Sequence, residues 1–264
     1  MTVMLRKALW DLRWTAFWFA IGGAGYTLMV SLFYPVVRDQ AQQFSQLLAT
    51  YPKGFLAALG TTDITTFTGY LGTESLNLFW PIIAAVFAVL AGAAVVAKEV
   101  EDGTSEIWLS IPAPRWRLLL AKLAALGVAV LAIAAAGASI VEVSALLVGA
   151  TVSAAGVFAM GAVMAAFVFT VAAYSSLLSS LLSSRGVAAG IAFAITLVSY
   201  MMWLIGGLAE GWKQLKSFSI FTAYTPQKAL ETGSLDLVSL GILAGITLGC
   251  VLAALVAFER RDAI

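Results

Sequence analysis

The chain contains no histidine and only one cysteine, Cys250, among its 264 residues. Histidine is the commonest general base and metal ligand, so its absence argues against most acid–base and transition-metal sites. One cysteine inside an apolar run cannot build a disulfide framework. Charged residues make up only 11% of the chain, against about a quarter in a soluble domain. These absences exclude an ordinary soluble enzyme.

The sequence also lacks the GxxxxGK[ST] pattern of a phosphate-binding loop, so the chain cannot hydrolyse ATP alone. The serine-rich stretch SSLLSSLLSS at 175–184 has no basic side chain beside it. We expect its hydroxyls to satisfy backbone carbonyls and ease a turn, not to act as nucleophiles. No catalytic residue, metal ligand or cofactor site is therefore predicted in this chain.

Apolar residues make up 61% of the chain, in long uninterrupted runs. A helix needs about 20 such residues to cross a bilayer, whereas a barrel strand needs only about ten, in alternation. We therefore predict one all-α membrane domain over 1–264, with a break between spans three and four at GATVSAAG, 149–156. The six predicted spans are 16–37, 78–97, 119–145, 156–178, 187–208 and 237–258.

Lysine and arginine placement predicts the orientation of these spans. With both termini in the cytoplasm, ten of the 15 basic residues fall on that side and five on the other. The acidic residues divide evenly and do not orient the chain. We therefore expect both termini inside, which places the polar stretch 99–117 in the cytoplasm.

The N-terminal residues 1–15 predict an amphipathic helix on the cytoplasmic leaflet, because apolar and charged residues alternate there at helical spacing. Trp10, Trp14 and Trp18 follow at four-residue spacing, which suits the aromatic belt at the membrane surface. We also expect this N-terminus to be retained, because an amphipathic stretch precedes the first apolar run. The residues assigned to this interfacial helix are Leu5, Arg6, Leu9 and Arg13.

Two outer segments are predicted, at 38–77 and 209–236. The first carries apolar residues in a partly amphipathic pattern broken at Tyr51-Pro52. The second is too aromatic for a solvated loop, so we expect a re-entrant hairpin packed in protein.

Glycine recurs every fourth residue in the last span, at Gly241, Gly245 and Gly249, and Gly186 with Gly190 opens the fifth. Such spacing lets helix backbones approach closely. Two interpretations stay open here: packing within one chain, or a seam between two copies.

The stretch EVEDGTSEIWLSIPAPRWR at 99–117 lies between two apolar runs. Asp102 or Thr104 can cap a helix start, and Pro112 forbids continuation of that helix. We expect a rod of about two turns, which is marginal alone in water and needs a surface. It is either a turn anchored in the membrane by Trp108 and Trp116, or a docking element for a cytoplasmic partner, with Lys122 tying its far end to the next span.

The segment KEVEDGTSEIWLSIPAPRWRLLLAK at 98–122 resembles the one that follows the second span in ABC-2 type exporter permeases. The amphipathic N-terminus, the six spans, SFSIFTAYTPQKALETG at 217–233 and the ending FERRDA extend the resemblance over essentially the whole chain. Pro114 departs from the small polar residue usual before the arginine. The matching positions are Glu99, Glu101, Gly103, Thr104, Leu109, Pro112, Arg115 and Lys122.

The resemblance implies two permeases, as a homodimer or with a similar permease, paired with two cytoplasmic ATPases that bind ATP and Mg²⁺. It implies that 99–117 contains the coupling helix, that 1–15 is the connecting helix and that 209–236 gates exit. The implied coupling residues are Glu99, Glu101, Asp102, Gly103, Thr104, Ile107, Trp108, Pro112 and Arg115. The implied outer-gate residues are Phe218, Phe221, Tyr224 and Pro226.

The expected function is export of a hydrophobic or amphiphilic substrate, such as a drug, antibiotic, peptide or lipid, from a prokaryotic cell. An ion-coupled transporter usually carries ionisable groups at mid-membrane, and this chain has almost none there. Glu142 lies about 30 Å of helix beyond Lys122, hence near the outer surface, as a snorkelling carboxylate or a substrate contact. An ATPase-regulated sensor or immunity subunit remains an alternative.

Overall fold

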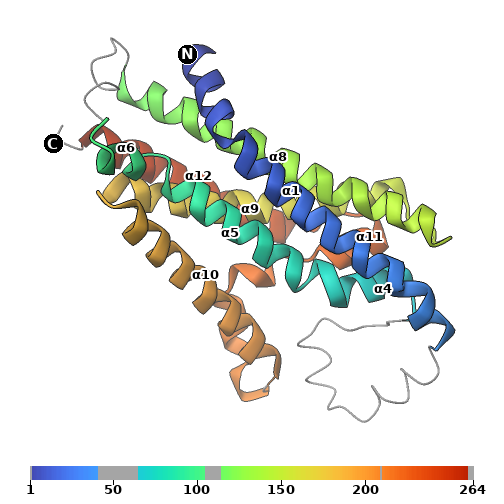
Figure 1. The fold of residues 1–264 in the computed structure, drawn as a ribbon. Helices are drawn as coiled ribbons and strands as arrows, with labels where there is room; N and C mark the ends of the chain where they lie inside the picture. Colours follow the sequence, from blue (N-terminus) through green and yellow to red (C-terminus); the bar gives the residue numbers. More distant parts are fainter. Residues whose placement is uncertain (1, 41–64, 105–113, 209, 261–264) are drawn as a thin grey trace.

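The structure, a computed structural model, describes residues 2–40, 65–104, 114–208 and 210–260, and every regular element in these ranges is helical. Six helices are long and apolar enough to cross a membrane, as predicted. Figure 1 shows them side by side, with both termini at the end of the bundle that carries the short helix α6 (Ala97–Glu101). We call this the α6 end, and the opposite end, with α11 (Pro226–Thr232), the α11 end.

The first crossing, α1 (Thr2–Asp39), is one continuous helix of 38 residues. At 1.5 Å per residue it is about 57 Å long, roughly twice the thickness of the hydrocarbon core. No helix end separates the predicted interfacial segment 1–15 from the first predicted span. Residues 2–15 are therefore the first part of α1 and not a separate helix, and their place on the membrane surface stays a prediction. Trp10, Trp14 and Trp18 are exposed along this helix.

The second crossing is longer than predicted, because its helical chain begins at Phe67, not near 78. Helix α4 (Phe67–Leu71) continues through a π-helical turn, η1 (Gly72–Leu76), into α5 (Phe79–Ala93). The last part of the predicted outer segment 38–77 thus belongs to this crossing. Residues 41–64 of that segment lie outside the described part of the chain.

Helices α8 (Arg115–Leu147) and α9 (Ala154–Leu181) form the third and fourth crossings. The break between them at 148–153 confirms the predicted one. Gly149 adopts a left-handed φ of 68° there, which favours glycine because it has no Cβ. Ser153 then caps α9 by accepting a hydrogen bond from the Gly156 amide at 2.9 Å.

After α10 (Arg185–Leu208) the chain turns back along this helix. The returning segment comprises η2 (Glu210–Phe218) and η3 (Ile220–Thr222). The Ser219 hydroxyl donates to the Ser199 carbonyl at 2.7 Å, and the Ile220 amide donates to the Ser199 hydroxyl at 3.0 Å. Because Ser199 lies nine residues before the end of α10, the chain has returned about 14 Å along the helix.

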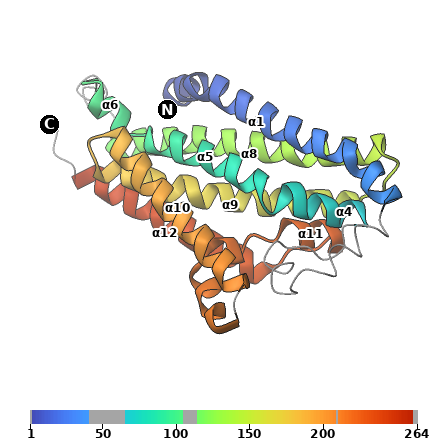
Figure 2. The ribbon, with the colours of Figure 1, turned by 60° about the horizontal axis from the view of Figure 1, so that its bottom comes forward.

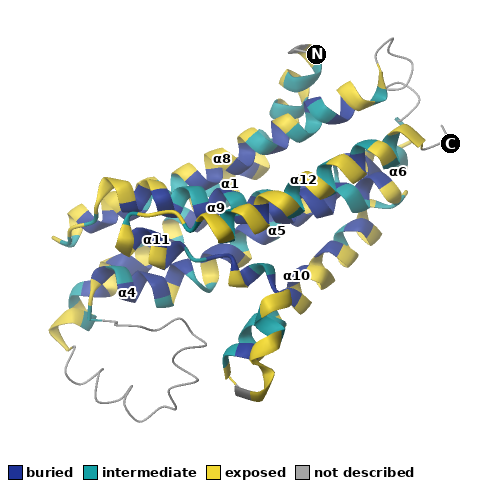
Figure 3. Cartoon of the chain, turned by 180° about the vertical axis from the view of Figure 1, so that it is seen from behind, coloured by how far each residue is buried: buried dark blue, intermediate teal, exposed yellow. Residues whose placement is uncertain are grey.

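Helix α9 is the centre of the bundle, since it contacts α5, α8, α10, α11 and the last crossing, α12 (Leu237–Arg260). Its most apolar window is 61% buried within the chain, against 11% for α12. In Figure 3, α12 and α10 accordingly carry long exposed stretches whereas the middle of the bundle is buried. The exposed faces of α1, α10 and α12 are apolar, as a bilayer requires.

Candidate functional site

Helix α6 follows α5 after a break of three residues, 94–96, and contains the first residues of the predicted coupling segment 99–117. It ends in a Schellman motif, with the Thr104 amide donating to the Glu99 carbonyl and the Gly103 amide to the Val100 carbonyl. Gly103 has the left-handed φ, 67°, that this motif requires. Glu101 is the last helical residue of α6 and Asp102 is its C-cap. The helix start that Asp102 or Thr104 was expected to cap falls at 105–113, outside the described residues, and stays a prediction.

A single hydroxyl joins the break between α5 and α6 to α9. Ser179 donates to the Ala93 carbonyl at 2.7 Å and accepts from the amides of Val96 and Ala97, each at 2.9 Å. The Ser179 side chain is fully buried. The helix break therefore does not leave these backbone groups unpaired, which would be costly in a membrane.

Three other serines of the 175–184 stretch behave as predicted. The hydroxyls of Ser175, Ser176 and Ser180 donate to carbonyls one turn earlier in α9. The sequence could not show that Ser179 reaches the break between α5 and α6, because it has the same local pattern as Ser175, Ser176 and Ser180.

Helices α5 and α9 approach most closely just beside this joint. A methyl group built on Gly92 would lie 2.7 Å from Ser175 Cβ and 2.8 Å from the Ala172 carbonyl oxygen. Such distances leave no room for a side chain, so Gly92 and the small serines of α9 bring the two backbones together.

An ion pair links α6 to α8. Lys122 binds the Glu99 carboxylate and also donates to the Val95 carbonyl at 2.7 Å. Both side chains are largely shielded, with 14% of Lys122 and 23% of Glu99 exposed. Lys122 therefore ties the 99–117 segment to the next span, but at the first residue of the segment, Glu99, and not at its far end as predicted.

Glu101 links α6 to α10. Its carboxylate accepts a hydrogen bond from the backbone amide of Arg185, the first residue of α10, at 2.8 Å. A carboxylate at this position also complements the positive end of the helix dipole. Thus Glu99 and Glu101, which the sequence suggested as contacts for a partner, are both used within the chain, and α6 is tied to α8, α9 and α10.

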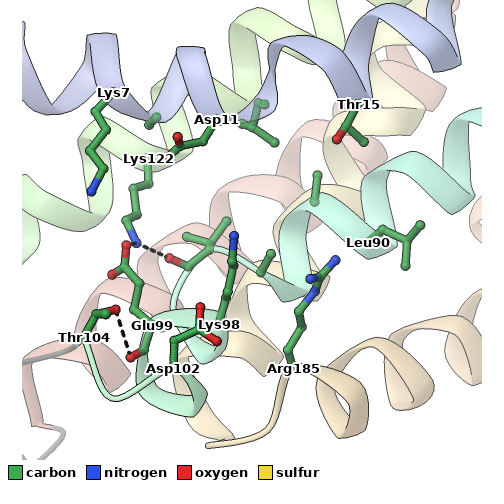
Figure 4. Close-up of a pocket in the computed structure, with 15 residues that line it drawn as sticks. Lys7, Asp11, Thr15, Leu90, Lys98, Glu99, Asp102, Thr104, Lys122 and Arg185 are labelled. Atoms are coloured by element: carbon green, nitrogen blue, oxygen red, sulfur yellow. Dashed lines mark hydrogen bonds and ion pairs between the residues drawn. The ribbon is translucent and has the colours of Figure 1, made fainter.

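These elements surround a cavity of about 480 Å³ between the start of α1, the end of α5, α6, α8 and the start of α10. Figure 4 shows charged side chains from four of these helices around it.

Three of the predicted coupling residues, Ile107, Trp108 and Pro112, lie outside the described residues. Arg115 begins α8 and is half-buried. The described members of the set therefore form the two ends of the segment, and its middle stays a prediction.

The predicted interfacial residues lie along the first turns of α1. Leu5 and Leu9 are half-buried, whereas Arg6 is exposed. The guanidinium of Arg13 stacks over the Trp10 ring, a cation–π contact.

The predicted outer-gate residues divide into two groups. Phe221, Tyr224 and Pro226 are buried, whereas Phe218 is 78% exposed. The rings of Phe221 and Tyr224 pack on Phe167 of α9, with centroids 4.9 and 4.6 Å away. A gate role for the four residues stays a prediction, but Phe218 points away from the cluster that the others form.

Tight neutral contacts close the α11 end. The Tyr224 hydroxyl donates to the Leu76 carbonyl at 2.9 Å, and the Asn77 amide donates to Gln227 at 2.9 Å. A methyl group on Gly72 would overlap the Gln227 side chain, and one on Gly156 would overlap the Leu230 carbonyl oxygen. Helix α11 therefore fits between the π-helical turn and the start of α9 without spare space.

Asp236 caps the start of α12 at this end. Its carboxylate accepts from the amides of Val238 and Ser239 at 3.1 and 3.3 Å. The hydrogen bonds from Ser239 and Val238, with the charge of Lys228, hold the pKa of Asp236 below its ordinary 3.8.

The glycines of α12 make no close contact within the described chain. A methyl group built on Gly241, Gly245 or Gly249 meets no atom within 4 Å, and the same holds for Gly190. Among the described residues, therefore, packing within one chain does not explain this spacing, and the seam between two copies stays a prediction.

Comparison with known families gives a match over nearly the entire chain. The family described as ABC-2 family transporter protein matches residues 14–263, which include α6 and most of the cavity lining. No curated protein matches the chain.

Proposed function

Because the chain belongs to the ABC-2 transporter family, we propose that it exports a hydrophobic or amphiphilic substrate, driven by ATP hydrolysis on a separate ATPase subunit. Family membership and the six apolar crossings identify it as a multi-pass membrane permease of an ABC transporter. Export, the substrate class, a homodimeric permease and a prokaryotic cell membrane are parts of the proposal.

The observation that carries the proposal is the way in which α6 is held. The segment that leads into residues 105–113 is joined to α8 by Lys122, to α9 by Ser179 and to α10 by the Arg185 amide. A force applied to 105–113 by an ATPase would therefore reach three spans together. An inert membrane anchor has no need for such a joint.

The proposed orientation places the α6 end in the cytoplasm. Lysine and arginine favour that side, and Lys98, Lys122 and Arg185 gather at this end of the bundle, as Figure 4 shows. The α11 end then faces outward, and Phe221 and Tyr224 are part of a closed outer gate.

The proposal is tested by reconstituting the chain with its ATPase in vesicles and measuring ATP hydrolysis and the movement of a fluorescent amphiphilic dye. We expect ATP-dependent dye transport away from the side that carries the ATPase. Absence of a stable complex with any ABC ATPase would overturn the proposal.

A variant in the undescribed middle of the segment tests the coupling role. Ile107→Asp is expected to leave insertion intact but to abolish dye transport, because a carboxylate would replace an apolar docking contact. Leu181→Asp, at an exposed apolar position of the same end, is the matched control and should transport normally. Equal transport by both variants would contradict a docking role for Ile107.

A further inference from the structure

The cavity at the α6 end has a lining that the transport proposal does not use. Apolar residues from α1 and α5, among them Leu12, Leu90 and Ala94, form one part of it. Charged residues form another part, where α5 has ended and α6 begins. The cavity thus spans the boundary between an apolar crossing and its polar end, and its volume of about 480 Å³ is in the range of small-molecule sites.

Two cationic groups in this lining, the Lys98 amine and the Arg185 guanidinium, form no ion pair with a described residue, although the Arg185 backbone amide binds Glu101. Within the described ranges, no carboxylate oxygen lies within 4.0 Å of the Lys98 amine or the Arg185 guanidinium. Figure 4 shows both side chains extending into the cavity, from α6 and from α10. Lys122, by contrast, is occupied by Glu99 and the Val95 carbonyl.

An acid lines the cavity from a different wall. Asp11 belongs to α1 and, among the described residues, has no cation within 4.0 Å. Asp102 also lines the cavity, from α6, and likewise forms no ion pair there. Among the described residues, Asp11, Lys98, Asp102 and Arg185 therefore face the same space without a direct ion pair between them, although Asp11 is close enough to Lys122 to interact with its charge.

Asp11, Lys98, Asp102 and Arg185 are exposed, so water or a ligand of complementary charge can pair with each of them. A phosphate fits between Lys98 and Arg185, since a guanidinium binds phosphate oxygens through two donors. A primary ammonium fits Asp11 on the α1 wall, and a hydrocarbon chain fits the apolar side at Leu90. A phospholipid with an amine headgroup carries an ammonium, a phosphate and hydrocarbon chains, with the phosphate in the middle.

We propose that the cavity binds a phospholipid with a phosphoethanolamine-type headgroup, its phosphate at Lys98 and Arg185 and its ammonium at Asp11. The lipid would fill the space between α1, α6 and α10 beside the segment that leads to 105–113. This proposal goes beyond the transport function and does not depend on it.

The test is native mass spectrometry of the purified full-length chain titrated with three lipids of matched chains: phosphatidylethanolamine, phosphatidylcholine and phosphatidylglycerol. We expect the tightest binding for phosphatidylethanolamine, because only its headgroup combines phosphate with N–H donors. Lys98→Gln and Arg185→Gln should each weaken binding of all three lipids about fivefold, from about 1 kcal/mol for each cation near the membrane surface.

Asp11→Asn distinguishes the contribution of the ammonium contact to lipid binding from that of the phosphate contact. This substitution should remove the preference for binding phosphatidylethanolamine over phosphatidylcholine, and it should not weaken the binding of phosphatidylglycerol. Arg260→Gln is the matched control, since Arg260 is an exposed cation outside the cavity lining and should leave all three affinities unchanged.

Equal binding of the three lipids by the unaltered chain would overturn the proposal, as would unchanged binding in both Lys98→Gln and Arg185→Gln. Water-soluble phosphoethanolamine distinguishes the source of the headgroup. If it binds as tightly as the lipid, the ligand is a free zwitterion and the lipid assignment is wrong; binding at least tenfold weaker supports the lipid.

Discussion

At the α6 end, charged side chains join the helices around a cavity, whereas at the α11 end hydroxyls, amides and aromatic rings join them in close contact. Figure 2 shows the two ends at opposite sides of the bundle, with α9 running between them. The ion pair of Lys122 with Glu99 belongs to the first region. The ring contacts of Phe167 and the Tyr224 hydrogen bond belong to the second.

The difference shows where this chain can change shape at low cost. An ion pair beside a cavity can exchange partners with water or with another chain, whereas interlocked rings and backbones have few alternative arrangements. The α6 end is therefore suited to receive a partner's movement, and the α11 end to hold helices in a fixed relation. Each prediction below tests one side of this contrast.

The largest effect is expected at the tightest contact of the α11 end. Gly156→Ala should lower the free energy of unfolding by about 3 kcal/mol, because the methyl group overlaps the Leu230 carbonyl and neither backbone can move freely. Unfolding in mixed detergent measures this change. Gly241→Ala, where space is open, should instead raise stability by about 0.5 kcal/mol. Similar values for the two variants would mean that α11 is not packed closely on α9.

The next largest effect is expected at the joint between α5 and α6. Ser179→Ala should lower the free energy of unfolding by about 2 kcal/mol, because it leaves the Ala93 carbonyl and the amides of Val96 and Ala97 without the hydroxyl that they bind. In the reconstituted transporter it should also reduce dye transport more than ATP hydrolysis. The control is Ser176→Ala, whose hydroxyl bonds only within its own helix and whose loss should cost under about 1 kcal/mol. Equal losses would show that the joint has no special role.

A pair of variants compares the ion pair at the α6 end with a neutral hydrogen bond at the α11 end. Glu99→Gln should lower the free energy of unfolding by about 1.5 kcal/mol, a value between those for exposed and buried ion pairs. This loss should become smaller as the salt concentration rises. Tyr224→Phe should cost about 1 kcal/mol for one buried hydrogen bond, independent of salt. Melting in low and high salt measures both. A stability loss in Tyr224→Phe that changes with salt, or one in Glu99→Gln that does not, would contradict the contrast between the charged α6 end and the neutral α11 end.

The smallest effect concerns the carboxylate that caps α12. Because its pKa is lowered in the folded chain, Asp236 stabilises the fold above its ordinary pKa of 3.8, and this contribution disappears as pH falls through the lower folded value. Asp236→Asn keeps a capping side chain but removes the charge. The difference in melting temperature between the two proteins should be present at about pH 5 and shrink towards about pH 3. A constant difference would mean that the charge contributes nothing.

The six crossings, the break before α9 and the internal use of the serine hydroxyls could be predicted, because each follows from local sequence. Length and hydropathy define a span, and a serine inside a helix has few partners besides the preceding turn. The start of the second crossing at Phe67 could not be predicted. Polar residues of 73–77 suggest a loop, but Thr27 pairs with Ser75, and Tyr26 donates to the Glu74 carbonyl, from a helix 48 residues away.

The candidate site was predicted as a segment but not as a set of contacts. An acidic pair before a glycine gives no sign of whether it faces a partner or its own chain. Glu99 and Glu101 point to different helices because α6 is short and lies between them, which depends on the tertiary fold. Gly103 similarly ends one helix here, although its sequence neighbours suggested the start of another.

The Ser179 hydroxyl has a mechanical consequence. One oxygen atom holds the carbonyl before the helix break and the two amides after it. Any motion of α6 relative to α5 that keeps these bonds is a rotation about that atom, because a translation would break at least one of them. Residues far from the pivot then sweep a wider arc than residues near it. A small tilt at the joint would thus be amplified along the lever that begins at Ala97.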